Sequence, residues 1–429
     1  GWRSGVFGFD GRLYCPPDGA SSILVVEPSR TIEPKTWRIP RPASSPESGA
    51  RGVAWNRGTL SRNGKIYCSP MDSPSCLVID PSSATAYCIG SLGDSQAKFS
   101  ALTEASNGKL YAAPFDGDSI CCVDTEKDQV CTHDMLCSTP NVRYSSGAKW
   151  ERGVLSPDGW LYCAPLGGTS VLQISTLDQN TKPLGSFSSI QGKWNEGVLG
   201  PDGKIFCSPD MMQSVLVIDS IKGALRQIGH FPEGRRKWTT GVLASNGLIY
   251  CSPLCTALVL VIDPVSETAW TIHLETSDDI DSGHEYMYKF LWAKGVEGPD
   301  KKIYCSPLRA NSVLVIDTES HNISLLKTRW DYSHARILPK WGEGSLGPDG
   351  RIYCLPAMHR EVGLLIIEPP GFRWSPETSM FFPRQFLRML FLLLLIRQRG
   401  AQVGYWALLP KDVLYDRIFA CFERRCFDL

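Results

Sequence analysis

The chain has 429 residues, and its 44 lysines and arginines balance its 44 aspartates and glutamates. Because no global field would draw such a protein onto nucleic acid, we expect no nucleic-acid binding. The length exceeds what one ordinary hydrophobic core supports, which favours a repeat architecture in which each unit shares a core with its neighbours.

One sequence pattern recurs eight times along the chain. Its clearest copy, residues 193–219, runs KWNEGVLGPDGKIFCSPDMMQSVLVID. The copies start 53, 44, 51, 44, 44, 54 and 49 residues apart, a spacing typical of one β-propeller blade per copy. The aromatic residues that open the copies are Trp2, Trp55, Phe99, Trp150, Trp194, Trp238, Trp292 and Trp341.

Each copy carries the signals of four short strands. In the clearest copy, the apolar runs 197–199 and 205–207 flank a Pro-Asp-Gly turn, which predicts a β-hairpin. The β-branched run 215–218 predicts a third strand, and the weaker run 224–228 predicts a fourth. Most variation in length falls after the third strand, so we expect the first three strands to form the constant part of each unit.

These copies predict an all-β fold, an eight-bladed β-propeller of four-stranded antiparallel blades over residues 1–370. Radial stacking lets each sheet cover the faces of its neighbours. A seven-bladed ring with one copy outside it is the alternative, because the third copy departs from the pattern at Phe99, Leu102 and Ala112.

The repeat ends near residue 370, and residues 371–429 predict a short α-helical tail. The apolar run 389–396 is too short to cross a bilayer core of about 30 Å, so we expect no transmembrane helix. We expect a helix here that packs against the propeller, with a shallow membrane contact through residues 386–397 as the alternative. Residues 409–419 resemble the start of an F-box, which would imply a ubiquitin-ligase adaptor.

Seven of the 16 cysteines occupy one repeat position on the second strand, where they are expected to be small buried hydrophobic residues one blade apart. They are Cys15, Cys68, Cys163, Cys207, Cys251, Cys305 and Cys354. Cysteines that serve as buried hydrophobic residues, too far apart for disulfides, favour a reducing compartment, so we expect a cytoplasmic protein. The sequence begins inside a repeat, which indicates an incomplete N-terminus.

The first strand of each propeller blade lies nearest the axis, so the residue before its glycine is expected at one mouth of the channel. Glu196 and Glu343 are the candidate catalytic residues, as metal ligands or general bases. Arg57, Arg152 and Lys294 are candidates for binding an anion.

Lysine precedes the opening aromatic residue in several copies, including Lys149, Lys193, Lys237 and Lys340. A ring of these ammonium groups would hold an anion, but the side chains would equally cover the indole faces, and we favour the structural role. We expect the repeated tryptophans to be structural wedges between blades. They are Trp55, Trp150, Trp194, Trp238, Trp292 and Trp341.

Cys131, His133 and Cys137 are the one group with the composition of a soft-metal site. Structural zinc sites usually show two paired Cys/His elements, and only one is present, so we favour a structural or surface role for these residues. We predict no cofactor, and a divalent metal only if the protein is an enzyme.

The hairpin of each copy, as in residues 157–162, and the third strand, as in residues 214–219, resemble the repeats of YVTN, NHL and gluconolactonase-like propellers. The resemblance covers about residues 2–370 and implies the fold. These families include protein-interaction platforms, lactone hydrolases and lyases. Gluconolactonase-like enzymes hold a divalent metal with Glu, Asn and Asp from different blades, and Glu196 and Glu343 are the nearest counterparts here.

We therefore expect a non-catalytic scaffold that binds a protein or another ligand through loops on one face. The segments predicted to carry recognition are residues 27–53, 125–148, 266–288 and 320–339. The first alternative is a metal-dependent hydrolase or lyase that acts at the channel mouth. The second is the F-box-like adaptor.

Overall fold

The structure is a computed structural model that describes residues 2, 4–29, 33–43, 53–93, 97–135, 148–274, 290–328, 339–357 and 363–370. The chain divides into two compact units, residues 1–379 and 380–429. Only the first unit contains described residues. The predicted helical tail, its apolar run and its F-box-like segment all lie outside them and stay predictions.

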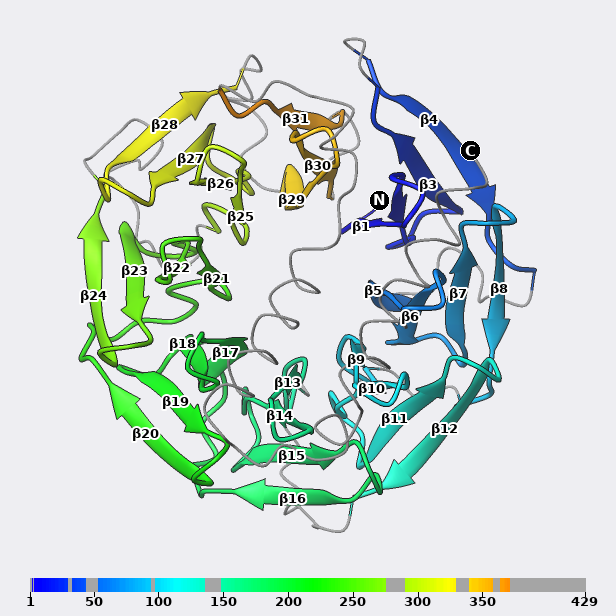
Figure 1. Cartoon of the computed structure of the whole chain (residues 1–429), viewed down its shortest axis with the longest axis horizontal. Helices are drawn as coiled ribbons and strands as arrows, with labels where there is room; N and C mark the ends of the chain where they lie inside the picture. The colour runs from blue at the N-terminus through cyan, green and yellow to red at the C-terminus, as the bar shows by residue number, and fades with distance from the viewer. Residues whose placement is uncertain are drawn as a thin grey trace, which may run out of the picture. The chain divides into compact units, whose positions relative to one another are not determined.

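The first unit is a ring of eight antiparallel sheets, with strands in chain order within each sheet (Figure 1). The innermost strands are β1 (Val6–Phe7), β5 (Trp55–Leu60), β9 (Thr103–Glu104), β13 (Val154–Leu155), β17 (Trp194–Leu199), β21 (Val242–Leu243), β25 (Val296–Glu297) and β29 (Trp341–Leu346). The second strands are β2 (Leu13–Cys15), β6 (Ile66–Pro70), β10 (Leu110–Ala112), β14 (Trp160–Cys163), β18 (Ile205–Pro209), β22 (Ile249–Cys251), β26 (Lys302–Cys305) and β30 (Ile352–Pro356).

The third and fourth strands of each sheet lie progressively further from the axis (Figure 1). The third strands are β3 (Ser22–Glu27), β7 (Cys76–Asp80), β11 (Ser119–Asp124), β15 (Val171–Ser175), β19 (Val215–Asp219), β23 (Leu258–Asp263), β27 (Ser312–Asp317) and β31 (Leu365–Ile367). The outer strands are β4 (Lys35–Pro40), β8 (Thr85–Ile89), β12 (Gln129–Asp134), β16 (Thr181–Leu184), β20 (Ala224–Ile228), β24 (Thr268–His273) and β28 (Ile323–Lys327). In the eighth sheet, three strands belong to the described residues.

The eight predicted blades are confirmed, and the third copy is one of them. Its departures from the pattern compensate one another. In the eighth blade, a Cβ added to Gly344 would lie 2.6 Å from Ile352 Cγ2 and 3.2 Å from Cys354 Sγ, so the inner strand needs glycine there. The third blade has Leu102 in place of this glycine and Ala112 in place of the cysteine, and both pack in one buried cluster. Leu110 and Ala112 of the third blade stand where the eighth has Ile352 and Cys354, so the leucine meets neither the isoleucine Cγ2 nor the sulfur.

The opening aromatic residues pack between adjacent blades. Trp292 of the seventh blade shares a buried cluster with Tyr250 and Val261 of the sixth. Its indole Nε1 donates to the Ser312 carbonyl oxygen at 2.7 Å, and the equivalent bond recurs in the other tryptophan blades. Each tryptophan thus ties the start of its inner strand to its own third strand while its ring fills the space between two sheets.

The serine after the repeated cysteine joins each of several blades to the next. Its hydroxyl donates to the carbonyl oxygen of the residue after the following blade's aromatic residue, as in Ser306 to Gly342 at 2.5 Å. Ser69, Ser208 and Ser252 make the same bond. Because a hydroxyl buried without a partner would be costly, this contact favours one relative position of neighbouring blades.

The eighth blade packs on the first and closes the ring. Ser345 Oγ donates to the Gly5 carbonyl oxygen at 2.9 Å, and Arg351 Nη1 donates to the Ser29 carbonyl oxygen at 3.0 Å. A buried cluster also joins Leu13 and Cys15 of the first blade to residues of β30. Closure therefore depends on side-chain bonds and apolar packing between the two ends of the repeat region.

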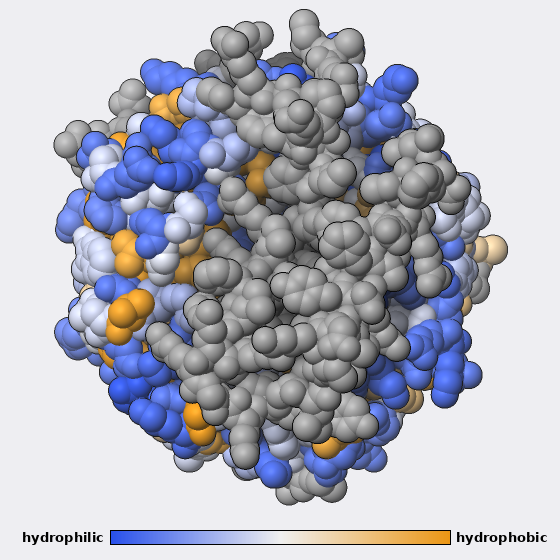
Figure 2. Space-filling view, viewed as in Figure 1, coloured by the Kyte–Doolittle hydropathy of each residue, from blue (hydrophilic) through white to orange (hydrophobic). Residues whose placement is uncertain are grey.

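Hydrophilic residues predominate on the described part of the face shown in Figure 2, with small hydrophobic areas among them. All seven cysteines of the repeat position are fully buried. Within the described ranges, no helix has the length and hydropathy needed to span a membrane.

Candidate functional site

A β-bulge at the start of three inner strands presents side chains to the interior of the ring. In β5, β17 and β29, the register against the next strand shifts between the tryptophan and the glycine. Two residues of the inner strand therefore stand opposite one residue of the second strand, which is the arrangement of a bulge. The second residue in each of these bulges is Arg57, Glu196 or Glu343.

The structure brings these three predicted residues together although they come from the second, fifth and eighth blades. Arg57 Nη1 lies 2.7 Å from Glu343 Oε2, and Arg57 Nη2 lies 3.7 Å from Glu196 Oε2. The Glu343 carboxylate, with smaller contributions from Glu196 and Glu151, raises the pKa of the Arg57 guanidinium above its ordinary value. Arg57 thus bridges two carboxylates across the ring.

Two further predicted cations lie near the Glu196 carboxylate. Burial alone would raise the pKa of Glu196, but Lys294, Arg57 and Arg152 outweigh it, and the pKa is lowered. Arg152 also donates through Nε to Thr103 Oγ1 of the third blade at 3.0 Å. Among the described residues, Glu196 Oε2 has no hydrogen-bond partner although it is buried. The mouth therefore combines opposite charges from five blades.

The sequence did not single out two further carboxyl groups, Glu151 in this cluster and Asp210 beside it, whose own charged neighbours are Arg235, Arg236 and Lys237. Burial and the nearby Glu196 carboxylate raise the pKa of Glu151 to about 7, and burial raises the pKa of Asp210 to about 6. The residue after the opening aromatic residue is Glu151 in the fourth copy, whereas other copies have Asn56, Ala293 or Gly342 there. This departure from the repeat is the feature of the sequence that could have identified Glu151. Glu151 gives the mouth a group that titrates near neutral pH.

The lysines before the aromatic residues lie away from this cluster, with their ammonium groups on loop carbonyl oxygens of the preceding blade. Lys193 Nζ donates to the carbonyl oxygens of Gly167, at 3.2 Å, and Ile190, at 2.5 Å. Lys149, Lys237 and Lys340 make equivalent bonds to Gly117, Met212 and Ala310. Burial lowers the pKa of Lys193 and of Lys237 to about 8.

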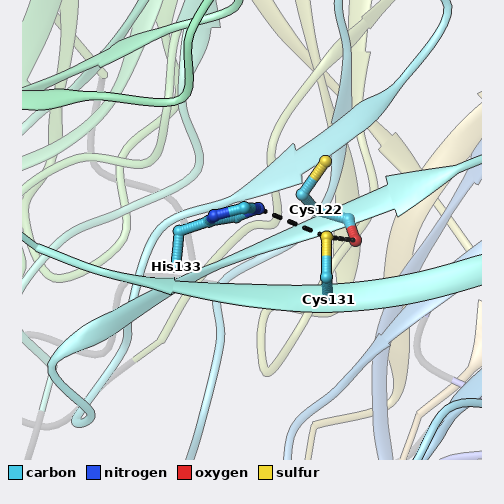
Figure 3. A group of neighbouring side chains, drawn as sticks. All are labelled: Cys122, Cys131 and His133. Carbon is cyan, nitrogen blue, oxygen red and sulfur yellow. Dashed lines mark hydrogen bonds between the residues drawn. The ribbon is translucent and has the colours of Figure 1, made fainter.

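Two of the three candidate soft-metal ligands, Cys131 and His133, lie on β12, and Cys137 lies outside the described residues. Cys131 Sγ is 3.3 Å from His133 Nε2 (Figure 3). The structure adds Cys122, on β11, which pairs directly with Cys131. The ligand atoms of Cys122, Cys131 and His133 all lie within 4.8 Å of one another. Sequence spacing did not suggest Cys122, because the two cysteines meet only through strand pairing.

The four segments predicted to carry recognition each include an outer strand, β4, β12, β24 or β28, and a long connection to the next blade. The connections begin and end beside the turns between second and third strands. After β12, Met135 N donates to the Asp118 carbonyl oxygen at 3.2 Å, and Lys149 N donates to the Phe115 carbonyl oxygen at 2.6 Å. After β24, the backbone N–H groups of Leu274 and Leu291 likewise donate to carbonyl oxygens of the turn between β22 and β23. Because these turns share one face of the ring, the long connections leave and return on that face.

No family model and no curated protein matches the sequence. Solved structures with a similar fold include virginiamycin B lyase from Staphylococcus aureus, at 14% identity and a TM-score of 0.51 over 70% of this chain and 91% of that one. The dihydro-heme d1 dehydrogenase NirN, solved in complex with DHE, is 13% identical with a TM-score of 0.57 over 86% of this chain and 76% of that one. A protein from Lactobacillus plantarum is 13% identical with a TM-score of 0.52, over 72% and 92%.

At these identities the likeness concerns the fold alone, because propellers of one architecture host unrelated activities. The resemblance to YVTN and NHL-like propellers is thereby confirmed at the level of the fold. The F-box-like resemblance of the tail has no support from these comparisons. The chain shares the β-propeller fold of a lyase and a dehydrogenase.

Proposed function

We propose that this protein is a non-catalytic β-propeller that binds a protein partner in the cytoplasm through the long connections on one face. The position of these connections supports the proposal, because recognition is commonly carried by loops held on a rigid frame. The free thiols of the described cysteines are compatible with a reducing compartment.

The position of Arg57 between Glu196 and Glu343 supports the proposal that the protein is not an enzyme. A metal-dependent propeller enzyme would need such carboxylates for a divalent cation. Here a guanidinium contacts both, at 2.7 and 3.7 Å, and supplies the positive charge that a cation would bring. A cation would have to displace Arg57 or bind beside its charge, and both are unfavourable.

Thermal unfolding with Mg²⁺, Ca²⁺ and Mn²⁺ tests this part. We expect no increase in Tm for the wild-type protein, and a Ca²⁺- or Mn²⁺-dependent increase for Arg57→Ala, which releases both carboxylates. Arg62→Ala is the matched control, because Arg62 pairs with Glu104 at 3.1 Å on an exposed surface. A metal-dependent increase in the wild type that Glu196→Gln abolishes would contradict the proposal.

Affinity capture with loop replacements tests the binding part. The residues between Met135 and Lys149 are replaced by those between Phe187 and Lys193, because both segments have equivalent backbone anchors at each end. We expect at least one of the four long-connection replacements to lose a partner that the wild type and Arg57→Ala both retain. If all four replacements retain every partner, recognition does not use these connections.

A second candidate function is an enzyme at the channel mouth, and the raised pKa of Glu151 favours it. A carboxyl group with a pKa of about 7 can hold or release a proton near neutral pH, as a general acid or base must. Arg57, Arg152 and Lys294 would then bind an anionic or lactone substrate. A lactone panel that shows turnover with an inflection near pH 7, lost in Glu151→Gln, would favour this function over the first. No turnover in the panel would count against it.

A further inference from the structure

The third blade differs from the others at three positions on its two outer strands. Cys122 stands where five blades have valine, at Val25, Val78, Val217, Val261 and Val315. Cys131, which pairs with it, stands where those blades have Trp37, Tyr87, Arg226, Trp270 and Ser324. His133 stands where they have Ile39, Ile89, Ile228, Ile272 and Leu326. Three soft or borderline donors thus replace three residues of the common blade.

Strand pairing brings these donors to one face of the sheet. Cys122 on β11 is directly opposite Cys131 on β12, and directly opposed residues of antiparallel strands point to the same side. His133 follows Cys131 by two residues and so shares its face. Figure 3 shows the imidazole directed at the Cys131 sulfur, with the Cys122 sulfur on the neighbouring strand. The three ligand atoms lie within 4.8 Å of one another.

We propose that Cys122, Cys131 and His133 bind a zinc ion on the outer strands of the third blade, with water at a fourth position. Two thiolates and an imidazole are ligands that Zn²⁺ prefers, at about 2.3 Å for sulfur and about 2.0 Å for nitrogen. Tetrahedral coordination places such ligand atoms roughly 3.5–3.8 Å apart, so small side-chain rotations close the site. Cys131 is exposed, which gives the ion a path from solvent and leaves room for the water.

The site is separate from the channel mouth, which lies at the innermost strands, and it does not depend on the proposed binding function. Because zinc binds thiolates, its binding displaces the thiol protons, and zinc affinity rises as pH rises. Release of protons on zinc binding gives a readout that ordinary packing of the residues would not produce.

Titration of the fully reduced full-length chain with Cd²⁺ and Zn²⁺ tests the proposal. Cd²⁺ reports thiolate ligands through its ultraviolet charge-transfer absorption, and Zn²⁺ should compete with it at one equivalent. We use Cys122→Val, Cys131→Ser and His133→Ile, because each restores a residue found at that position in another blade. We expect each variant to weaken Zn²⁺ binding by at least about 100-fold.

Cys88→Ser is the matched control, since Cys88 lies on the outer strand of the second blade opposite Leu77. It should bind zinc like the wild type. Binding without a thiolate band, a band that survives in all three variants, or equal loss in the control would overturn the proposal. If the metal-free variants melt at the same temperature as the wild type, their folds are intact. A loss of zinc binding then results from the loss of a ligand.

Discussion

Single residues set the charge at the channel mouth, and Glu151 is the one that changes near neutral pH. With all groups ionised, Arg57, Arg152 and Lys294 balance Glu151, Glu196 and Glu343. Because the pKa of Glu151 is about 7, protonation in mildly acidic solution leaves the mouth with an excess of positive charge. We therefore expect this group of residues to attract anions more strongly below pH 7 than above it.

The raised pKa of Glu151 also makes stability depend on pH. The folded protein binds this proton more tightly than the unfolded chain, so the contribution is complete below pH 4.5, the ordinary value, and is lost as pH rises through about 7. We expect Glu151→Gln to be more stable than the wild type by about 1–2 kcal/mol at pH 8, after allowance for solvent screening, with little difference at pH 4.5. Denaturant unfolding across pH 4.5–8 measures the difference. A constant difference across this range would contradict the shifted pKa.

In the third blade, Leu102 replaces the common glycine and Ala112 replaces the common cysteine. This pair of replacements gives a second prediction at the residue scale. Ala112→Cys alone places a sulfur where Leu102 packs, and overpacking of this kind costs about 1–3 kcal/mol. Adding Leu102→Gly, which restores the common pair, should recover part of that loss. Unfolding of both single variants and the double variant measures the coupling between the sites. Additive effects would mean that the two side chains do not share one space.

At the scale of elements, the strands follow from local sequence, whereas the site depends on irregularities in pairing. Short apolar runs around Pro-Asp-Gly turns predicted the hairpins, and Lys301 takes the positive φ of +62° where other copies have the turn glycine. The bulges that present Arg57 and Glu343 inward were not predictable, because a bulge depends on the register of two strands. The pairing of Cys122 with Cys131 was hidden for the same reason. The repeat position alone was enough to select Arg57, Glu196 and Glu343 as candidates.

Where lysine precedes the opening aromatic residue, its side chain joins two elements, and this contact gives a prediction at that scale. Lys340 Nζ donates to the Ala310 carbonyl oxygen and to Asn311 Oδ1, both at 2.9 Å, between the turn of the seventh blade and β29. Lys340→Met leaves these acceptors without that donor, so we expect a loss of about 1–3 kcal/mol in the free energy of unfolding. Lys222→Met, at an exposed turn, is the control and should change stability by less than about 0.5 kcal/mol. Equal effects would mean that the buried ammonium group does not hold the turn.

At the scale of the whole molecule, the ring joins residues that are far apart in sequence. Arg57 and Glu343 are separated by 286 residues and meet at 2.7 Å. Their contact requires that the inner strands of the second and eighth blades face the same axis and that the eighth blade closes on the first. The proposal that no catalytic metal binds at the mouth depends on the same contact, because the Arg57 guanidinium supplies the positive charge that a metal ion would bring.

A double-mutant cycle between Arg57 and Glu343 measures this contact directly. Arg57→Ala, Glu343→Ala and the double variant are compared with the wild type by denaturant unfolding. We predict a coupling free energy of about 1 kcal/mol, as for a partly buried ion pair, and a decrease of this coupling at high salt. Effects that add to within about 0.3 kcal/mol would contradict the ion pair across the mouth and, with it, the argument for the proposal that no catalytic metal binds there.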